Sequence, residues 1–246
     1  MRINVYISST GYCSRREADR LIESHRVTIN HQPALKGMDV QDNQTVCIDG
    51  IPLLNRPKWV TIAYHKPIGI ESTTDQKKPH NIIDAIGYPE RVFPIGRLDK
   101  ATSGLILLTN DGQIVNQILR SENAHEKEYL VQVDHPYDAN FIYQMAQGVE
   151  IYNPVRHEKI ITKPATITPV TSHSFRLIIV QGLNLQIRRM CQALGYRVTS
   201  LKRLRIMNVH LGDLPIGKWR YLTENETKTL MNLIHQDATP ISKNNV

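Results

Sequence analysis

The sequence predicts an α+β protein in which a small N-terminal unit precedes a larger domain on a mixed, mainly antiparallel sheet. Strand-like and helix-like segments follow one another irregularly, without the strict strand–helix alternation of a parallel sheet. The pattern changes near residue 59, and 41% of the 246 residues are apolar, which suffices for a buried core. We expect an N-terminal unit with its linker over residues 1–58, a larger domain over 59–235 and a mobile polar tail over 236–246.

The first element of the N-terminal unit is expected to be an amphipathic helix after Ser14. Ser14 is a favourable N-cap residue, and Glu17 stands three residues later, as in a capping box. Ala18, Leu21 and Ile22 then recur at helical spacing, which makes one face of the helix apolar.

Two short strands should follow this helix, over residues 25–30 and 46–48. The first runs into NHQP, residues 30–33, and the second ends at the Asp-Gly pair of residues 49–50; both sequences are typical of turns. The sequence NRPK, residues 55–58, is expected to be a linker. A unit of this size is near the lower limit for a free-standing core.

The larger domain is expected to contain several strands and three helices. Apolar segments predict strands over residues 60–64, 92–96, 105–109, 129–133 and 175–180. The expected N-caps of the helices are Asp111, Asn184 and Thr223, the last in a capping box with Glu226, and Gly195 ends the second helix. Their apolar faces consist of Ile114, Val115, Ile118 and Leu119, of Ile187, Met190, Cys191 and Leu194, and of Leu230, Leu233 and Ile234.

Positive charge is concentrated in one part of the chain, although the net charge is only +7. Between Lys159 and Gly212 there is no Asp or Glu. The basic residues of this stretch are Lys159, Lys163, Arg176, Arg188, Arg189, Arg197, Lys202, Arg203 and Arg205. Such a block favours an anionic partner such as a phosphate backbone. A basic solvated surface without a particular ligand is the alternative.

The three cysteines, Cys13, Cys47 and Cys191, form no C-x-x-C pair, so we expect neither a disulfide framework nor a zinc site. Buried thiols in a reducing cytosol are the simpler interpretation, and the N-terminus lacks the apolar core of a signal peptide. No apolar run approaches the roughly 20 residues that span a bilayer. We expect a cytoplasmic protein with no membrane association. No metal cluster, glycine-rich phosphate loop or nicotinamide fingerprint is present, so no metal or cofactor is expected.

The sharpest local feature is GRLDKATSG, residues 96–104, which joins two expected strands through a turn bounded by glycines. Asp99 therefore lies where a rigid sheet presents a loop, a common platform for catalytic groups. An Asp in such a turn often only bonds its own backbone, which is the alternative.

Residues 96–104 resemble the catalytic loop of pseudouridine synthases of the RsuA type. Further segments resemble other motifs of that family in the expected order: HKPIG (65–69), KEY (127–129), QGLNLQIRRM (181–190) and LPIGKWRYLT (214–223). Residues 2–50, with SRREA (14–18) and RVTIN (26–30), resemble the alpha-L RNA-binding motif that precedes the catalytic domain in this group. Within the group, residues 125–129 and 180–190 are similar to the RluF branch, which modifies large-subunit ribosomal RNA.

The resemblance implies an enzyme that isomerises specific uridines in structured RNA to pseudouridine. It implies large-subunit ribosomal RNA as the partner and leaves open whether transfer RNA is a second substrate; we also expect a monomer. It assigns Asp99 as the catalytic carboxylate and Tyr129 as the face on which the flipped base stacks. Arg188 occupies the family position of a cation that keeps Asp99 charged, and a guanidinium can grip a carboxylate with two hydrogen bonds.

The resemblance also implies RNA contacts around these groups and on the first helix. The implied RNA-binding residues are Arg97, Leu98, Asp99, Lys100, Leu185, Gln186, Ile187, Arg188, Arg15 and Arg16. Leu185 departs from the pattern, because close relatives carry Arg there. Ser24-His25 and Asn43-Gln44 likewise stand where the N-terminal motif has a glycine turn and Gly-Asp.

Two other functions share some of these features. A non-catalytic RNA-binding factor would use the basic residues but would not need Asp99, Tyr129 and Arg188 together. An N-glycosidase-like hydrolase would also place a carboxylate at a sugar, but it would release free uracil. The sequence leaves open which uridine is modified and whether Asp99 first attacks the sugar or the base.

Overall fold

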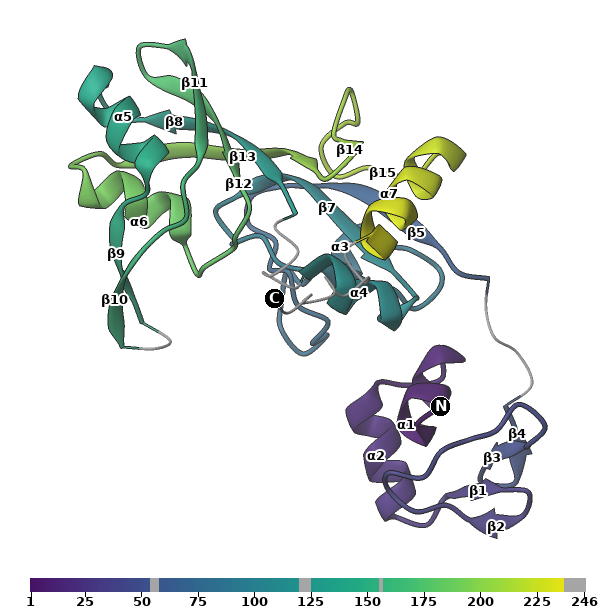
Figure 1. Ribbon diagram of the computed structural model, residues 1–246. Coiled ribbons are helices and arrows are strands. Elements are labelled where there is room, and N and C mark those ends of the chain that lie inside the picture. The colour runs from purple at the N-terminus through teal and green to yellow at the C-terminus, as the bar shows by residue number, and fades with distance from the viewer. Residues whose placement is uncertain (54–57, 120–124, 155–156, 237–246) are drawn as a thin grey trace, which may run out of the picture. The chain divides into compact units, whose positions relative to one another are not determined.

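The computed structural model describes residues 1–53, 58–119, 125–154 and 157–236. The chain forms two compact units (Figure 1). The smaller comprises Met1–Val60 with Pro89–Arg91 and Asn110–Gly112, and the larger comprises Thr61–Tyr88, Val92–Thr109 and Gln113–Val246. Most of the expected linker, and the expected tail except for its first residue, lie outside the described residues.

The smaller unit packs two helices against a small sheet. Its elements are α1 (Ile3–Ser9), α2 (Arg15–Glu23), β1 (Val27–Ile29), β2 (Gln32–Pro33), β3 (Val46–Ile48) and β4 (Ile51–Pro52), with strand order β2-β1-β3-β4. Ser14 caps α2 as predicted, since its side chain accepts a hydrogen bond from the Glu17 N–H at 3.1 Å. The preceding helix, α1, was not predicted, because no side chain caps its N-terminus. Ile3 and Ile7 of α1 are buried in the core of the unit.

Both predicted turns of this unit are two-residue hairpin loops with left-handed backbone. Asn30 and His31 have φ of 49° and 66°, and Asp49 and Gly50 have φ of 51° and 78°. Positive φ at both central residues is the type I′ geometry that matches the twist of the flanking strands. His25, which stands at the expected glycine turn, also adopts a left-handed φ of 59°.

The larger unit is built on one nine-stranded sheet. Its strands are β5 (Thr61–Lys66), β6 (Phe93–Ile95), β7 (Ser103–Thr109), β8 (Lys127–Val133), β11 (Thr166–Thr171), β12 (Ser174–Ile179), β13 (Val198–Ile206), β14 (Val209–His210) and β15 (Trp219–Tyr221). The order is β11-β12-β8-β13-β7-β5-β15, with β14 on β13 and β6 on β7. The pair β7–β13 is parallel and the other described pairs are antiparallel, so the predicted mixed, mainly antiparallel sheet is confirmed.

Helices and one separate hairpin complete this unit. They are α3 (Ile82–Ile86), α4 (Gly112–Leu119), α5 (Ala139–Gln147), α6 (Gln186–Ala193) and α7 (Glu224–Gln236), with the hairpin β9 (Glu150–Asn153) and β10 (Glu158–Ile161). One core cluster joins Ala63, Leu105 and Leu107 of the sheet to α4 and α7. At the other end of the sheet, the hairpin runs beside α6 (Figure 1).

Two details of the predicted helices were wrong. The N-cap of α6 is Leu185, in a left-handed conformation without a side-chain cap bond, and the Asn184 side chain accepts a hydrogen bond from Arg189 instead. Leu119, expected on the apolar face of α4, is 44% exposed. The capping box of α7 is confirmed by reciprocal hydrogen bonds of 2.9 and 3.1 Å between Thr223 and Glu226.

Candidate active site

Asp99 lies on the loop that joins β6 to β7, and this loop is held in place by its carbonyl groups. The Asp99 carbonyl accepts a hydrogen bond from the Thr102 N–H at 2.9 Å, and the Lys100 carbonyl accepts one from the Gly69 N–H at 2.8 Å. The Ala101 carbonyl accepts one from Arg188 Nη2 at 2.9 Å. Side-chain orientation at a catalytic position depends on such backbone support. Asp99 itself is half-buried, so part of the residue is open to solvent.

Strand register places three buried polar side chains on one face of the sheet near this loop. Lys66 on β5 lies opposite Gly104 on β7, Gly104 lies opposite Arg203 on β13, and Arg203 lies opposite Tyr129 on β8. Residues directly opposite each other on neighbouring strands share a face. Lys66 is fully buried, and Arg203 and Tyr129 are 4% and 8% exposed. Because Gly104 has no side chain, nothing from β7 separates the two cations at this position.

Lys66 is the buried cation that interacts with Asp99. Its Nζ donates to the carbonyls of Pro67 and Ile70 at 2.9 and 2.7 Å. Burial lowers the pKa of Lys66 to about 8, the charge of Asp99 opposes this shift, and Arg203 adds to it. The motif HKPIG thus contributes a buried cation to the candidate site, although the sequence did not predict a role for Lys66.

Arg203 adds a second buried positive charge. Its Nε donates to the Leu105 carbonyl at 2.7 Å, whereas Nη2 is buried and has no hydrogen-bond partner among the described residues. Burial, with a contribution from Arg203, also lowers the pKa of Lys127 to about 8. The sequence predicts Arg203 only as a member of the basic block, because the pairing of β13 with β7 and β8 joins distant parts of the chain.

Arg188 reaches the catalytic loop, but the expected two-point grip on Asp99 is not present. The guanidinium donates to the Ala101 carbonyl at 2.9 Å and to the Val198 carbonyl at 3.3 Å. Its Nε is buried without a partner among the described residues. Arg188 therefore links the loop to the start of β13, because its guanidinium donates to two carbonyl oxygens and not to the Asp99 carboxylate.

The other implied RNA contacts are divided between exposed and buried side chains. Arg97, Lys100 and Leu185 are exposed, as are Arg15 and Arg16 on α2 of the smaller unit. Leu98, Gln186 and Ile187 are buried, being 5%, 3% and 5% exposed. Gln186 accepts a hydrogen bond from the Leu183 N–H at 3.0 Å, so its side chain closes the turn before α6. In this structure these three side chains do not form an outward RNA-contacting wall.

The basic block is not a uniformly free surface. Ion pairs join Lys159 to Glu150 at 2.9 Å, Arg176 to Glu128 at 2.9 Å, Arg197 to Asp134 at 3.6 Å, and Arg205 to Glu126 and Glu128 at 2.8 and 3.1 Å. The acid-free stretch thus finds its carboxylates upstream, on or next to β8 and β9. This pairing across strands could not be read from the local charge pattern.

Other features of the structure do not add to this site. Cys47 and Cys191 are buried free thiols, and burial raises the pKa of Cys191 to about 12; Cys13 is only half-buried. The described part of the chain has no cluster of three or more metal-ligating residues. None of the helices in that part is both long and apolar enough to cross a membrane.

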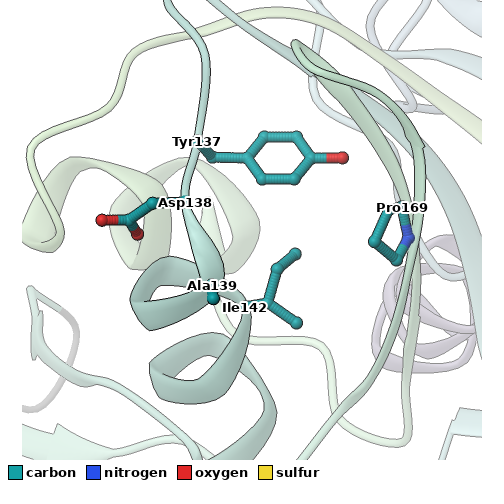
Figure 2. A pocket seen from close by; sticks show the side chains of 5 residues that line it. All are labelled: Tyr137, Asp138, Ala139, Ile142 and Pro169. Carbon is teal, nitrogen blue, oxygen red and sulfur yellow. The ribbon is translucent and has the colours of Figure 1, made fainter.

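A hollow away from the site lies between α5 and β11 (Figure 2). Its lining residues are Tyr137, Asp138, Ala139, Ile142 and Pro169. The Tyr137 hydroxyl donates to the Thr171 and Ser174 carbonyls, and Asp138 caps α5, so the polar groups here already have structural roles.

Two family models match this chain. Residues 60–193 match the family of RNA pseudouridylate synthases, and residues 1–46 match the S4 domain. The chain is 46% identical over 243 residues to the dual-specificity RNA pseudouridine synthase RluF of Escherichia coli (strain K12), with 98% of this chain and 82% of that protein covered. It is 33% identical to the ribosomal small subunit pseudouridine synthase A of Yersinia pestis, with 92% and 96% covered.

A solved structure shares the architecture. The crystal structure of a pseudouridylate synthase superimposes with a TM-score of 0.68 at 29% identity, covering 94% of this chain and 99% of that one. The matches extend over both units, and the loop with Asp99 lies within the segment matched by the synthase model. The chain therefore belongs to the RNA pseudouridylate synthase family and isomerises uridine in RNA to pseudouridine.

Proposed function

We propose that Asp99 is the catalytic carboxylate, that Tyr129 stacks on the flipped uracil and that Arg188 holds the catalytic loop at the site. The reaction breaks the bond between C1′ and N1 of uracil, rotates the base and forms a bond between C1′ and C5. The proton on C5 is lost and N1 gains a proton, so the RNA keeps its composition. One carboxylate placed against the sugar and base can act as nucleophile or base in this sequence.

The observation that carries this proposal is the half-buried Asp99 on a loop whose carbonyls are held from several elements. Lys66 provides a buried positive charge that interacts with the Asp99 carboxylate. Tyr129, on the same face of the sheet as Lys66 and Arg203, supplies an aromatic ring for the base. Base–aromatic stacking contributes about 1–3 kcal/mol, against a cost of a few kcal/mol for taking the base out of its stack.

We propose large-subunit ribosomal RNA as the substrate, with transfer RNA as a second one. The sequence resembles the RluF branch, and the relative of that name is described as dual-specific for RNA. Exposed Arg97 and Lys100 are the proposed phosphate contacts of the catalytic loop, and Arg15 and Arg16 those of the N-terminal module. We place this RNA-binding module at residues 1–58 and the catalytic domain at 59–235, and we propose a cytoplasmic monomer.

The decisive experiment compares Asp99→Asn with wild type on RNA that carries tritium at C5 of uridine. We expect at least a thousandfold slower tritium release, with an RNA Kd within about twofold, because Asn keeps the shape but cannot attack or accept a proton. Asp213→Asn, at an exposed aspartate, is the control and should retain full activity. Turnover of Asp99→Asn within tenfold of wild type would exclude the assigned role.

The same reactions distinguish isomerisation from hydrolysis of the base, and a second experiment identifies the substrates. Wild type should release tritium without free uracil, because an isomerase keeps the base attached to the RNA. Mapping pseudouridine across total RNA from a strain that lacks the protein identifies the uridines. Loss of modification only outside ribosomal and transfer RNA would contradict the proposed substrates.

A further inference from the structure

We propose that Ser72 is a positioning residue, which fixes the location of Asp99 by binding the backbone of the preceding residue, Leu98. The inference rests on the proposed catalytic role of Asp99. Ser72 lies after β5, on the segment that also contains Gly69, and is 8% exposed. Its hydroxyl has no direct part in the chemistry that we propose.

One hydroxyl satisfies both backbone groups of the residue that precedes Asp99. Ser72 Oγ accepts a hydrogen bond from the Leu98 N–H at 3.0 Å and donates one to the Leu98 carbonyl at 2.9 Å. A serine hydroxyl can do both, because it carries one donor hydrogen and two acceptor lone pairs. The Leu98 side chain is buried as well, so the residue is fixed by its side chain and its backbone.

These two bonds complete the support on the N-terminal side of Asp99. On the other side, the carbonyls of Asp99, Lys100 and Ala101 accept bonds from Thr102, Gly69 and Arg188. The carbonyls of four consecutive residues, 98–101, are thus held by four different donors. Three of these carbonyls belong to Asp99 and the two residues after it. On the N-terminal side of Asp99, the described hydrogen bonds of the Leu98 backbone are made by Ser72 alone.

The segment that carries Ser72 is itself anchored, so the hydroxyl is presented from a fixed position. The Glu71 N–H donates to the His80 carbonyl at 2.9 Å, and the Thr73 N–H donates to the Glu71 carbonyl at 2.9 Å. Buried Lys66 Nζ binds the carbonyls of Pro67 and Ile70 at the start of the same segment. A shift of about 1 Å in a reacting group can reduce a rate about a hundredfold, so support of this kind acts on the chemical step.

The test measures single-turnover rates at saturating RNA, the RNA Kd and the melting temperature for Ser72→Ala, Ser72→Thr and Thr73→Ala. Ser72→Ala should slow the chemical step about 10- to 100-fold with a Kd within about twofold of wild type. Ser72→Thr, which keeps the hydroxyl, should recover the rate to within about threefold. Thr73→Ala is the matched control, because its hydroxyl accepts a bond from Asp75 and none from the catalytic loop.

A full rate in folded Ser72→Ala would overturn the inference, as would a loss of affinity alone. If Ser72→Ala does not fold, Ser72→Cys replaces it, since a thiol fills the space of the hydroxyl but is a weak donor and a weak acceptor; a full rate in that variant would equally overturn the inference. Asp99→Asn, measured alongside, separates the two proposals. An inactive Asp99→Asn beside a fully active Ser72→Ala leaves the function standing and removes only the role of Ser72, whereas an active Asp99→Asn removes the catalytic assignment itself.

Discussion

Gly104 on β7 faces the backbone of Arg203 on β13 so closely that a Cβ atom on Gly104 would lie 2.3 Å from the Arg203 carbonyl oxygen and 2.4 Å from its nitrogen. Gly104 also has a φ of 110°, a backbone conformation that residues with a side chain rarely adopt. The close approach occurs where the two strands run parallel, between Lys66 and Arg203. A glycine at the end of GRLDKATSG is therefore needed to join the strands that carry the two buried cations.

Gly104→Ala should lower the free energy of unfolding by at least about 3 kcal/mol, because backbone atoms of β13 must move and the left-handed φ is strained. Urea denaturation followed by circular dichroism measures the change. Gly182→Ala is the control, since a Cβ there meets no atom within 4 Å, and it should change stability by less than about 0.5 kcal/mol. Equal stability of the two variants would show that the strands can separate without cost.

Arg188 and Arg189 should affect different steps, because they lie about 100° apart on α6. Arg188 bridges the carbonyls of Ala101 and Val198, whereas Arg189 contacts the Tyr152 carbonyl and Asn184. Arg189→Ala should weaken RNA binding and reduce the slope of log affinity against log salt by roughly 0.7–0.9, with little change in the single-turnover rate.

Arg188→Ala should slow the single-turnover rate about 10- to 100-fold, because the catalytic loop loses a donor. Arg188→Lys keeps the charge and thus the salt slope, but its compact ammonium lacks the planar fork that spans two carbonyls, so the rate should also fall. Binding titrations at several salt concentrations and single-turnover assays check both variants. Loss of affinity alone in Arg188→Ala would identify Arg188 as a phosphate contact.

Lys66 should make the stability of the protein depend on pH above pH 8. Its pKa in the folded protein is about 8, below its ordinary value of 10.5, so between these values the unfolded chain binds more protons than the folded one. Stability contributed by this group therefore rises with pH across that window, by at most about 1.4 kcal/mol per pH unit. In Lys66→Met this contribution is absent.

Between pH 7.5 and pH 9.5, the free energy of unfolding of wild type should consequently rise relative to that of Lys66→Met. Urea denaturation at both values measures this. Lys77→Met, at an exposed lysine, is the control, and its free energy of unfolding should differ from that of wild type by the same amount at both pH values. A pH-independent difference for Lys66→Met would contradict the shifted pKa.

Removal of residues 1–58 should leave a folded catalytic domain that binds structured RNA more weakly. The smaller unit has its own core around Ile3, Ile7 and Val46, and the large sheet begins at Thr61. Circular dichroism and RNA titrations of the truncated and full-length chains test this. An unfolded or insoluble product would show that the boundary is misplaced.

Local signals predicted much of the fold, and long-range pairing explains most of what was missed. Ser14, Thr223 and Glu226 cap helices through contacts three residues apart, so their roles could be recognised in the sequence. The cap of α6 was misplaced by one residue because Leu185 adopts a left-handed conformation that its residue type does not favour.

In the candidate site, too, the features set by local sequence could be predicted and those set by long-range strand pairing could not. Residues 96–104 could be recognised from their motif, and the structure places Asp99 on a well-supported loop. The proximity of Lys66, Arg203 and Tyr129 depends on the order β5-β7-β13-β8, which no local pattern encodes. For the same reason, the carbonyl partners of Arg188 and the carboxylates that pair with Arg176 and Arg205 could not be predicted. The chemical roles of Asp99, Tyr129 and Arg188 stay predictions.

The parallel junction of β7 and β13 also sets the order in which a growing chain can acquire its site. A nascent chain that ends before Val198 already contains Asp99, Tyr129 and Arg188, yet it lacks the strand that joins β8 to β7 and carries Arg203. Such distant pairings form slowly, because a long loop must close before they contribute any contact. The buried charge of Arg203 therefore joins that of Lys66 only after β13 has left the ribosome, so a chain in which β5, β7 and β8 are already made still has an incomplete candidate site.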